Sequence, residues 1–434
     1  MLRKTTRIIS ILFFLSAFTA LISPLAYWYL IGENLSQFSI YEQRELSPFL
    51  NDSILNFKMA VKRLFQLLPE EAGELFFNQF FNHSFQLAFS EGVRDQFPLR
   101  IEQIQFNRGF ERMLISAAYF FVKDQAIPAD LESNYLITRD QSTFLKEAEV
   151  FAYADQKNID FRIRDYQEFI ENYPEINLYV YSIQTAEFSD WHPHSKLIPD
   201  ADSGRSLQYF LNKKPAQLEF MSFDLKDFSD YQKYFFSTDH HWNIHGALKG
   251  YREIYKMLSE KNMDISPLVE ITTVKPMEGV DLLGSIARLT LYPIEPDRFE
   301  TAEYELPPYK TYRDGEEIFI GRKNAYEKGN FPDRKYENHY RQYYGWNREI
   351  VVYKFENNSD RNLLMITSSH AICIQDLIAS HYKEAVVADH RAKYFLEHSI
   401  DELIDQYDID DIIILGQPSL TYLSKDFLLS RENE

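Results

Sequence analysis

Short apolar segments alternate with amphipathic ones in the last third of the chain, and no other feature restricts the fold as strongly. Residues 363–367 (LLMIT), 385–388 (AVVA) and 411–415 (DIIIL) have the length and composition of buried strands. Residues 371–382 and 396–407, which lie between them, predict helices. Strands that are apolar along their whole length need cover on both faces, and intervening helices provide it. The pattern therefore predicts an α/β domain with a parallel sheet flanked by helices.

The α/β pattern begins well before this region. Residues 177–183 (NLYVYSI) and 216–221 (AQLEFM) predict strands, and residues 242–260 predict an amphipathic helix. Residues around 275–350 are instead rich in Tyr, Pro, Gly and charges, which favours an irregular insertion. We therefore assign residues 151–434 to the α/β domain and place the insertion inside it.

The N-terminal segment has the features of a membrane anchor. Arg3, Lys4 and Arg7 precede an uncharged apolar run over residues 8–30. As a helix this run would span about 34 Å, enough to cross a bilayer. The basic flank predicts a cytoplasmic N-terminus and an extracytoplasmic body. A cleaved signal peptide is the alternative, but we predict a single uncleaved transmembrane helix, so that residues 1–30 are cytoplasmic tip and anchor.

The segment after the anchor predicts helices. Phe57, Val61, Leu64 and Leu68 recur at spacings of three and four residues, which is the period of one helix face. We assign residues 31–150 to a helical membrane-proximal region.

Composition excludes one class of function. The chain has 434 residues, with 46 basic against 65 acidic ones and a formal net charge of −19. Such an acidic chain would approach a nucleic acid against its own field, so no nucleic-acid partner is expected. The single cysteine, Cys373, excludes an intrachain disulfide. Its apolar neighbours predict a buried, unreactive side chain.

Residues 237–243 (STDHHWN) carry the sharpest local signal for chemistry. In an extended segment Asp239 and His241 point to the same side and His240 points away. A carboxylate beside an imidazole fixes its tautomer and stabilises the imidazolium that forms when the ring accepts a proton. This pair needs a nucleophile as its third member.

Ser369 is the best candidate nucleophile. It lies in residues 366–370 (ITSSH), directly after a predicted strand and before a predicted helix. Open α/β sheets place reactive groups at the carboxyl ends of parallel strands, and N–H groups at a helix start can stabilise an oxyanion. The alternative interpretation of a serine at this place is a helix N-cap.

A metal site is a further alternative. His241 and His245 are four residues apart and would share a helix face, so that together with Asp239 they could bind a metal ion. His192 and His194 flank a proline in a predicted loop, and we expect them to be solvated.

Several motifs together resemble those of a known family. Residues 238–243 (TDHHWN) resemble the signature of the DHHW family, which is related to the SGNH-hydrolase-like proteins that acetylate alginate and other bacterial exopolysaccharides. Shorter elements of the same relatives are matched by residues 42–48 (EQRELSP), 95–100 (DQFPLR), 284–285 (GS) and 343–346 (YYGW).

The resemblance implies an SGNH-hydrolase-like fold and a role for each candidate residue. Asp239 would orient the imidazole, His241 would be the general base and Ser369 the nucleophile. The backbone N–H groups of Ser369 and Gly284 would stabilise the oxyanion.

The serine motif departs from the family's D-S-Y-x-N form. Ser368 stands at the position of the acid, His370 at that of the tyrosine and Ile372 at that of the asparagine. The missing asparagine removes an oxyanion donor, so a non-catalytic protein that keeps the hydrolase fold is an alternative.

We therefore expect an extracytoplasmic, membrane-anchored O-acetyltransferase or esterase that acts on a cell-envelope polysaccharide through Ser369, His241 and Asp239, without a cofactor. The relatives further imply a membrane protein that exports the acyl group. The alternatives are a non-catalytic glycan-binding or assembly protein, and a metal-dependent hydrolase at Asp239, His241 and His245.

Overall fold

The computed structural model describes residues 38–39, 44–45, 100–120, 125–262, 264–319, 326, 336–345, 350–424 and 428–429. The chain forms two compact units, Met1–Leu114 and Ile115–Glu434. The predicted anchor lies outside the described residues, as does most of the predicted helical region. Among the helices that are described, none has the length and apolar character needed to cross a bilayer.

The first unit contains a short antiparallel pair, β1 (Phe38–Ser39) and β2 (Arg44–Glu45). Helix α5 (Arg100–Ala118) begins in this unit and ends in the second. All other described elements belong to the second unit.

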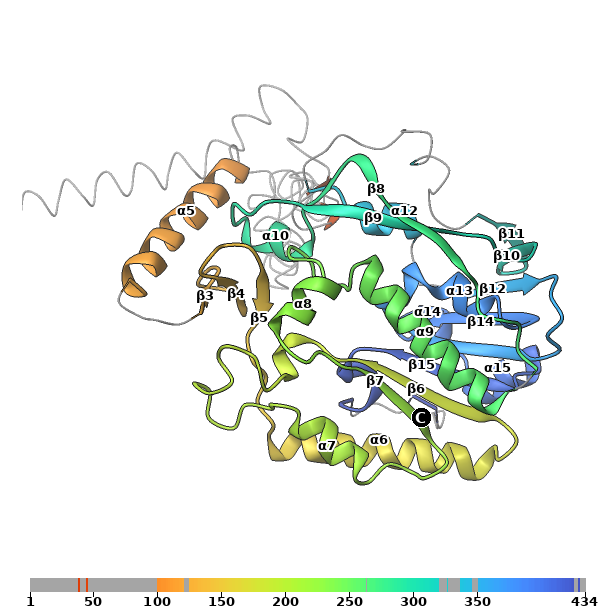
Figure 1. Ribbon diagram of the computed structural model, residues 1–434. Coiled ribbons are helices and arrows are strands. Elements are labelled where there is room, and N and C mark those ends of the chain that lie inside the picture. The colour runs from red at the N-terminus through yellow and green to blue at the C-terminus, as the bar shows by residue number, and fades with distance from the viewer. Residues whose placement is uncertain are drawn as a thin grey trace, which may run out of the picture. The chain divides into compact units, whose positions relative to one another are not determined.

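The second unit is built on an eight-stranded sheet with the order β11-β10-β12-β14-β13-β15-β6-β7 (Figure 1). Five neighbouring strands are parallel to one another. They are β6 (Asn177–Ile183), β7 (Glu219–Phe223), β13 (Asn362–Thr367), β14 (Glu384–Asp389) and β15 (Asp411–Gly416). The predicted parallel sheet is confirmed, with strands close to the predicted bounds.

The five parallel strands follow a familiar order that begins late in the chain. Counted from β13, the spatial order β14-β13-β15-β6-β7 is 2-1-3-4-5, one of the two common orders of doubly wound sheets. The chain therefore forms the fourth and fifth strands of this order first and the first three last. In such sheets the ligand site lies where the connections diverge, between the first and third strands. Here these strands are β13 and β15.

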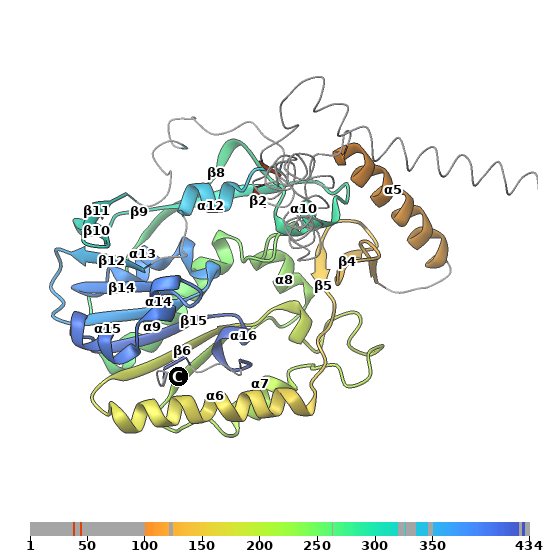
Figure 2. The ribbon, with the colours of Figure 1, turned by 180° about the vertical axis from the view of Figure 1, so that it is seen from behind.

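Helices cover both faces of the sheet (Figures 1 and 2). Helices α9 (Ile244–Lys261) and α13 (Gln375–Ala379) bury side chains in one core, and α6 (Tyr153–Asn172) and α15 (Ile400–Tyr407) in the other. Strand β6 supplies both cores, because its successive side chains point to opposite faces. Tyr179 enters the first core and Leu178 enters the second.

Shorter helices complete the described part of the second unit. They are η1 (Ala186–Phe188), α7 (Arg205–Leu211), α8 (Phe228–Tyr234), α10 (Ser285–Thr290), α12 (His339–Tyr344), η2 (Ser369–Cys373), α14 (Lys393–Glu397) and α16 (Pro418–Thr421).

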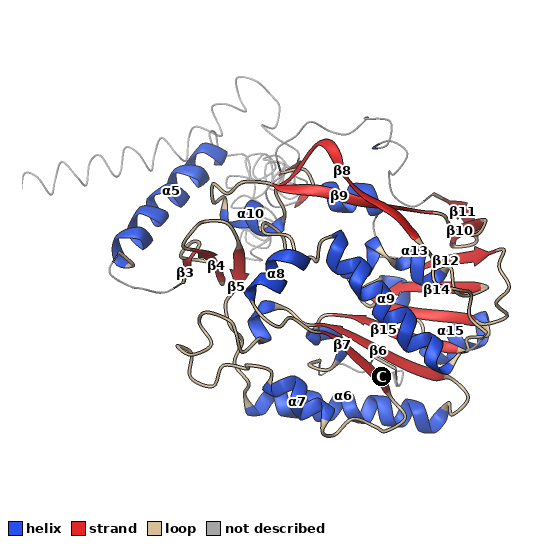
Figure 3. Ribbon diagram, in the orientation of Figure 1, coloured by secondary structure: helices blue, strands red, loops and turns tan. Residues whose placement is uncertain are grey.

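The segment 275–350 is more regular than predicted. Strands β8 (Ile271–Leu282) and β9 (Asp297–Tyr304) form an antiparallel ribbon (Figure 3), and β10 (Tyr309–Arg313), β11 (Glu316–Ile318) and β12 (Ile350–Phe355) extend the main sheet antiparallel. Both faces of the β8–β9 ribbon carry many polar side chains, so it lacks the apolar pattern that marks buried strands. The expectation of an irregular insertion was wrong for these residues.

A second correction concerns the region predicted to be helical. Strands β3 (Ala126–Pro128), β4 (Tyr135–Thr138) and β5 (Phe144–Lys146) form a small antiparallel sheet there. His192 and His194 pack against this sheet, and their Nε2 atoms lie 2.9 Å from Lys146 O and 3.1 Å from Ala126 O. Both histidines are buried, so the expectation of solvated rings was wrong.

The start of α9 is packed so tightly that it requires glycine. A Cβ atom at Gly246 would overlap the carbonyl oxygen of Tyr234 and approach Trp242 Cβ to 3.1 Å. Gly109 in α5 has open space by comparison, with Arg112 Nη2 at 3.8 Å. We predict that Gly246→Ala lowers the free energy of unfolding by about 1–3 kcal/mol despite the better helix propensity of alanine. Gly109→Ala should not lower it. Urea denaturation measures both, and equal stability of Gly246→Ala and wild type would contradict the packing argument.

Candidate active site

A tight loop before α9 carries the predicted acid and base. Phe235 and Trp242 form an isolated antiparallel bridge, and Asn243 caps the helix by accepting from the N–H groups of His245 and Gly246. The intervening residues turn back on themselves and are not extended, contrary to the geometry assumed from the sequence. The loop is nevertheless anchored at both ends, which fixes the direction of its side chains.

The structure brings Asp239, His241 and Ser369 into one hydrogen-bonded chain. His241 Nδ1 lies 2.5 Å from Asp239 Oδ1, and His241 Nε2 lies 2.8 Å from Ser369 Oγ across 128 residues of sequence. Ser369 begins η2, directly after β13, so it stands at the switch point of the sheet. Asp239 and His241 are buried, whereas Ser369 is partly exposed. The three residues predicted to form a triad are therefore in contact, with Ser369 nearest to solvent.

Asp239 is held on its other side by the backbone of a second loop. Its Oδ2 accepts a hydrogen bond of 2.5 Å from the N–H of Ser285, and Gly284 packs directly against its side chain. Burial acts to raise the pKa of Asp239, but the nearby His241 and His240 rings and these hydrogen bonds hold it well below its usual range. The carboxylate thus remains charged at neutral pH.

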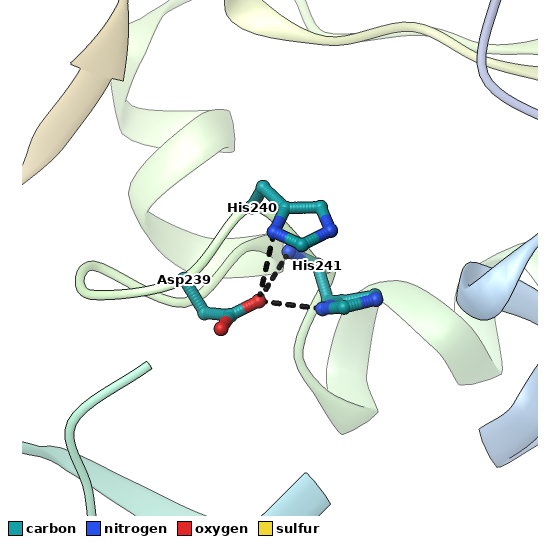
Figure 4. Close-up of side chains that lie close together, drawn as sticks. All are labelled: Asp239, His240 and His241. Atoms are coloured by element: carbon teal, nitrogen blue, oxygen red, sulfur yellow. Dashed lines mark hydrogen bonds and ion pairs between the residues drawn. The ribbon is translucent and has the colours of Figure 1, made fainter. Parts of the chain in front are cut away.

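His240 also turns toward this carboxylate, which the sequence did not predict. Its Nδ1 lies 3.4 Å from Asp239 Oδ1 and 2.7 Å from Ser285 Oγ. Figure 4 shows both histidine rings beside Asp239, with the second nitrogen of His241 directed away from it. Because the loop is folded and not extended, neighbouring residues can face the same group.

Asp297, at the start of β9, supports the loop and was missed from the sequence. Its Oδ1 accepts from the N–H of Ser237 at 2.9 Å, and its Oδ2 accepts from the N–H and the hydroxyl of Thr238 at 2.8 and 2.6 Å. Burial raises its pKa. It escaped prediction because it lies about sixty residues away, in the segment expected to be irregular.

Aromatic rings enclose the imidazole of His241. Tyr340 on α12 stacks on it with ring centroids 4.5 Å apart and an interplanar angle of 20°. The ring centroid of His370 lies 4.8 Å from that of His241. The backbone carbonyl of His370 accepts a hydrogen bond from Trp242 Nε1 at 2.8 Å. Tyr340 was also missed, although it stands just before the YYGW motif. These contacts restrict the His241 ring to the orientation that reaches Ser369.

The two predicted oxyanion donors are placed differently. The Gly284 N–H donates to Thr238 Oγ1 at 3.0 Å, so it is engaged inside the loop scaffold. The Ser369 N–H opens η2, where first-turn N–H groups have no acceptor within the helix. The Gly284 N–H is therefore already used, and the Ser369 N–H is the remaining candidate for the oxyanion donor.

His245 does not join the other histidines. Its Nε2 lies 2.9 Å from Glu300 Oε2 on the exposed side of α9. Among the described residues, the group close enough to share a metal ion consists of Asp239, His240 and His241. The predicted ligand set of Asp239, His241 and His245 was therefore wrong.

Cys373 lies inside the domain, as predicted. It is buried beneath the serine segment, and burial raises the pKa of its thiol to about 11. The thiol therefore stays protonated at neutral pH and is not an activated nucleophile.

Comparisons with known proteins identify the fold. No protein-family model and no curated protein matches the sequence. Among solved structures, PatB1 from Bacillus cereus, determined with a sulfonyl adduct, matches with a TM-score of 0.52 at 20% identity, covering 69% of this chain and 99% of that one. A DHHW family protein from Eubacterium siraeum matches with a TM-score of 0.50 at 18% identity, covering 69% of this chain and 97% of that one.

The chain thus shares the α/β fold of PatB1 and of this DHHW family protein, which agrees with the resemblance of residues 238–243 to the DHHW signature. The similarity extends over nearly the whole length of PatB1.

Gly284 should be required for the hydrogen bond between Asp239 and His241. A Cβ atom at this position would overlap the Asp239 side chain. We predict that Gly284→Ala displaces Asp239 and abolishes the far-downfield ¹H NMR signal expected for the proton on His241 Nδ1. Ser285→Ala is the matched control, because it keeps the backbone N–H that binds Asp239. An unchanged signal in Gly284→Ala would show that Gly284 does not position the acid.

The buried histidines should make stability depend on pH. Burial, with the neighbouring His241 and His240, lowers the pKa of His370 well below 6.5. Below about pH 6.5 this histidine therefore binds a proton in the unfolded chain but not in the folded chain. The free energy of unfolding then falls as the pH falls, by about 1.4 kcal/mol per pH unit for this histidine. Urea denaturation at pH 7.5 and 5.5 measures the effect. His370→Asn should show a smaller pH dependence than wild type, and an equal one would contradict the assignment.

Proposed function

We propose that the protein is an acyl-ester enzyme that uses Ser369 as its nucleophile. The observation that carries the proposal is the continuous contact from Asp239 Oδ1 through both nitrogens of His241 to Ser369 Oγ, at 2.5 and 2.8 Å. These distances are within the range needed for a base to take a proton from a nucleophile and for an acid to orient that base.

The reaction follows from the order of the three groups. Ser369 Oγ attacks the acyl carbonyl while its proton passes to His241 Nε2, and the charged Asp239 stabilises the resulting imidazolium. The Ser369 N–H donates to the oxyanion. Collapse of the tetrahedral intermediate breaks the ester bond, and His241 returns the proton to the leaving alcohol. A sugar hydroxyl or water then attacks the acyl-enzyme in the same manner and releases Ser369.

The similar structures support the same class of chemistry. PatB1 carries a sulfonyl adduct, and sulfonylating reagents are electrophiles that activated nucleophiles attack. For this chain we propose acetyl transfer to, or removal from, a cell-envelope polysaccharide. We further propose an extracytoplasmic location and a membrane anchor at residues 8–30. An acyl group used outside the cell must be brought across the membrane, so we also propose a membrane-embedded acyl donor system.

Hydrolysis of p-nitrophenyl acetate by the full chain tests the proposal. We predict that Ser369→Ala, His241→Ala and Asp239→Asn each lower the rate by roughly 10³-fold or more. His245→Ala is the matched control, because this histidine lies on the surface with Glu300 and should leave the rate unchanged. Equal rates for wild type and Ser369→Ala would reject the proposed triad and favour the non-catalytic alternative.

A covalent probe provides a second readout of the same prediction. Phenylmethylsulfonyl fluoride should form an adduct with Ser369, with loss of fluoride, and mass spectrometry should locate it on the peptide that contains η2. The adduct should be absent from Ser369→Ala and reduced in His241→Ala. Modification of a different residue in the wild-type chain would contradict the assignment of the nucleophile.

A further inference from the structure

A cavity lies beside the serine segment, within the same unit. It has a volume of about 370 Å³ and lies between α12, α13 and the β10–β11 hairpin. A cavity of this size accommodates a small organic ligand. Its lining includes Tyr309, Phe319, Tyr344, Ile372, Gln375 and Asp376.

The cavity and the triad share two structural elements. Ile372 lies in η2, three residues after Ser369, or about 6 Å along a helix of this type. Tyr340 and Tyr344 are one turn apart on α12: the first stacks on His241 and the second lines the cavity. Their ring centroids are 5.2 Å apart. A group bound in the cavity would therefore lie next to the serine.

Gln375, which lines the cavity, has a buried side-chain acceptor without a partner among the described residues. Gln375 is 5% exposed, its Nε2 donates to Tyr353 OH at 2.9 Å, and its Oε1 has no hydrogen-bond partner among the described residues. Leaving such an acceptor unpaired costs about 1–3 kcal/mol, so its presence needs an explanation. A ligand hydroxyl would supply the missing donor once the Gln375 amide turns toward the cavity that the residue lines.

The other walls are typical of a site for a polyhydroxylated ring. Phe319 is 94% exposed. Tyr309 stacks on Phe355 with ring centroids 4.9 Å apart, but it is still 43% exposed. Both rings therefore present aromatic surface to solvent. The face of an aromatic ring is electronegative and attracts the C–H groups on one face of a pyranose. The buried Asp376 carboxylate accepts from Tyr304 OH at 3.0 Å and adds acceptor capacity beside Gln375. Lys310 and Glu317 pair at 2.9 Å on the hairpin and compensate each other's charge.

We propose that this cavity binds one neutral pyranose unit of the polysaccharide, with a hydroxyl on Gln375 Oε1 and the ring against Tyr309 and Phe319. The identification of this sugar as part of the acceptor or substrate rests on the proposed function. The binding site itself does not require catalysis. Its place next to η2 makes it a subsite that presents a neighbouring sugar to Ser369.

Saturation-transfer difference NMR with the full chain tests the site, with methyl glycosides of glucose, galactose, mannose and N-acetylglucosamine as probes. We expect ring-proton signals from at least one probe at millimolar concentration. Tyr309→Ala and Phe319→Ala should reduce them at least fivefold, and Gln375→Leu should remove them. Tyr312→Ala is the matched control, because Tyr312 belongs to the same strand but lines a different cavity. Absence of signal for all four glycosides, or signals that survive in Tyr309→Ala and Phe319→Ala, would overturn the proposal.

Catalysis is measured separately in the same variants. Tyr309→Ala and Phe319→Ala should hydrolyse p-nitrophenyl acetate at the wild-type rate, because this small ester does not need the sugar site. Ser369→Ala should keep the sugar signals and lose hydrolysis. Absence of sugar signals from a wild-type chain that hydrolyses the ester would overturn only the subsite, whereas an unchanged hydrolysis rate in Ser369→Ala would overturn only the proposed triad.

Discussion

The geometry of the site depends on one buried carboxylate. Asp239 binds His241 on one side and the N–H of Ser285 on the other, so it joins the loop before α9 to the loop before α10. A charge in such a place is tolerated only when it is fully paired, because an unpaired buried carboxylate is strongly disfavoured. The two loops must therefore close on Asp239 correctly before the imidazole has a defined direction. Asp297 strengthens the same junction by accepting three hydrogen bonds from Ser237 and Thr238.

The sheet supplies the second half of the site. Its switch point lies between β13 and β15, and the serine segment begins there. The segment then continues past His241 to the cavity that contains Gln375. One stretch of chain thus connects Ser369 with the proposed sugar site, and α12 makes a second connection through Tyr340 and Tyr344. This arrangement separates the proposed triad from the groups that would select the substrate.

The sequence predicted those parts of the structure that depend on local patterns. The strand segments are apolar along their length and lie where predicted, and Asp239 and His241 are close in sequence, so their contact could be anticipated. Asp297, Tyr340 and Gln375 could not be found in this way, because each acquires its role from contacts between distant segments. The ribbon of β8 and β9 was also missed, since strands with polar residues on both faces have no distinctive period. His192 and His194 were misjudged because a loop with a proline can still pack beneath a small sheet.

The position of β15 has a consequence for how the molecule is assembled. This strand is the last of the sheet in chain order, yet it lies between β13 and β6 and pairs with both. The two groups of strands, one built from β6 and β7 and the other from β12 to β14, cannot join until it inserts between them. Pairings of such long sequence separation form slowly. During synthesis Asp239 and His241 therefore emerge long before β15 can join the two groups of strands and bring Ser369 beside them.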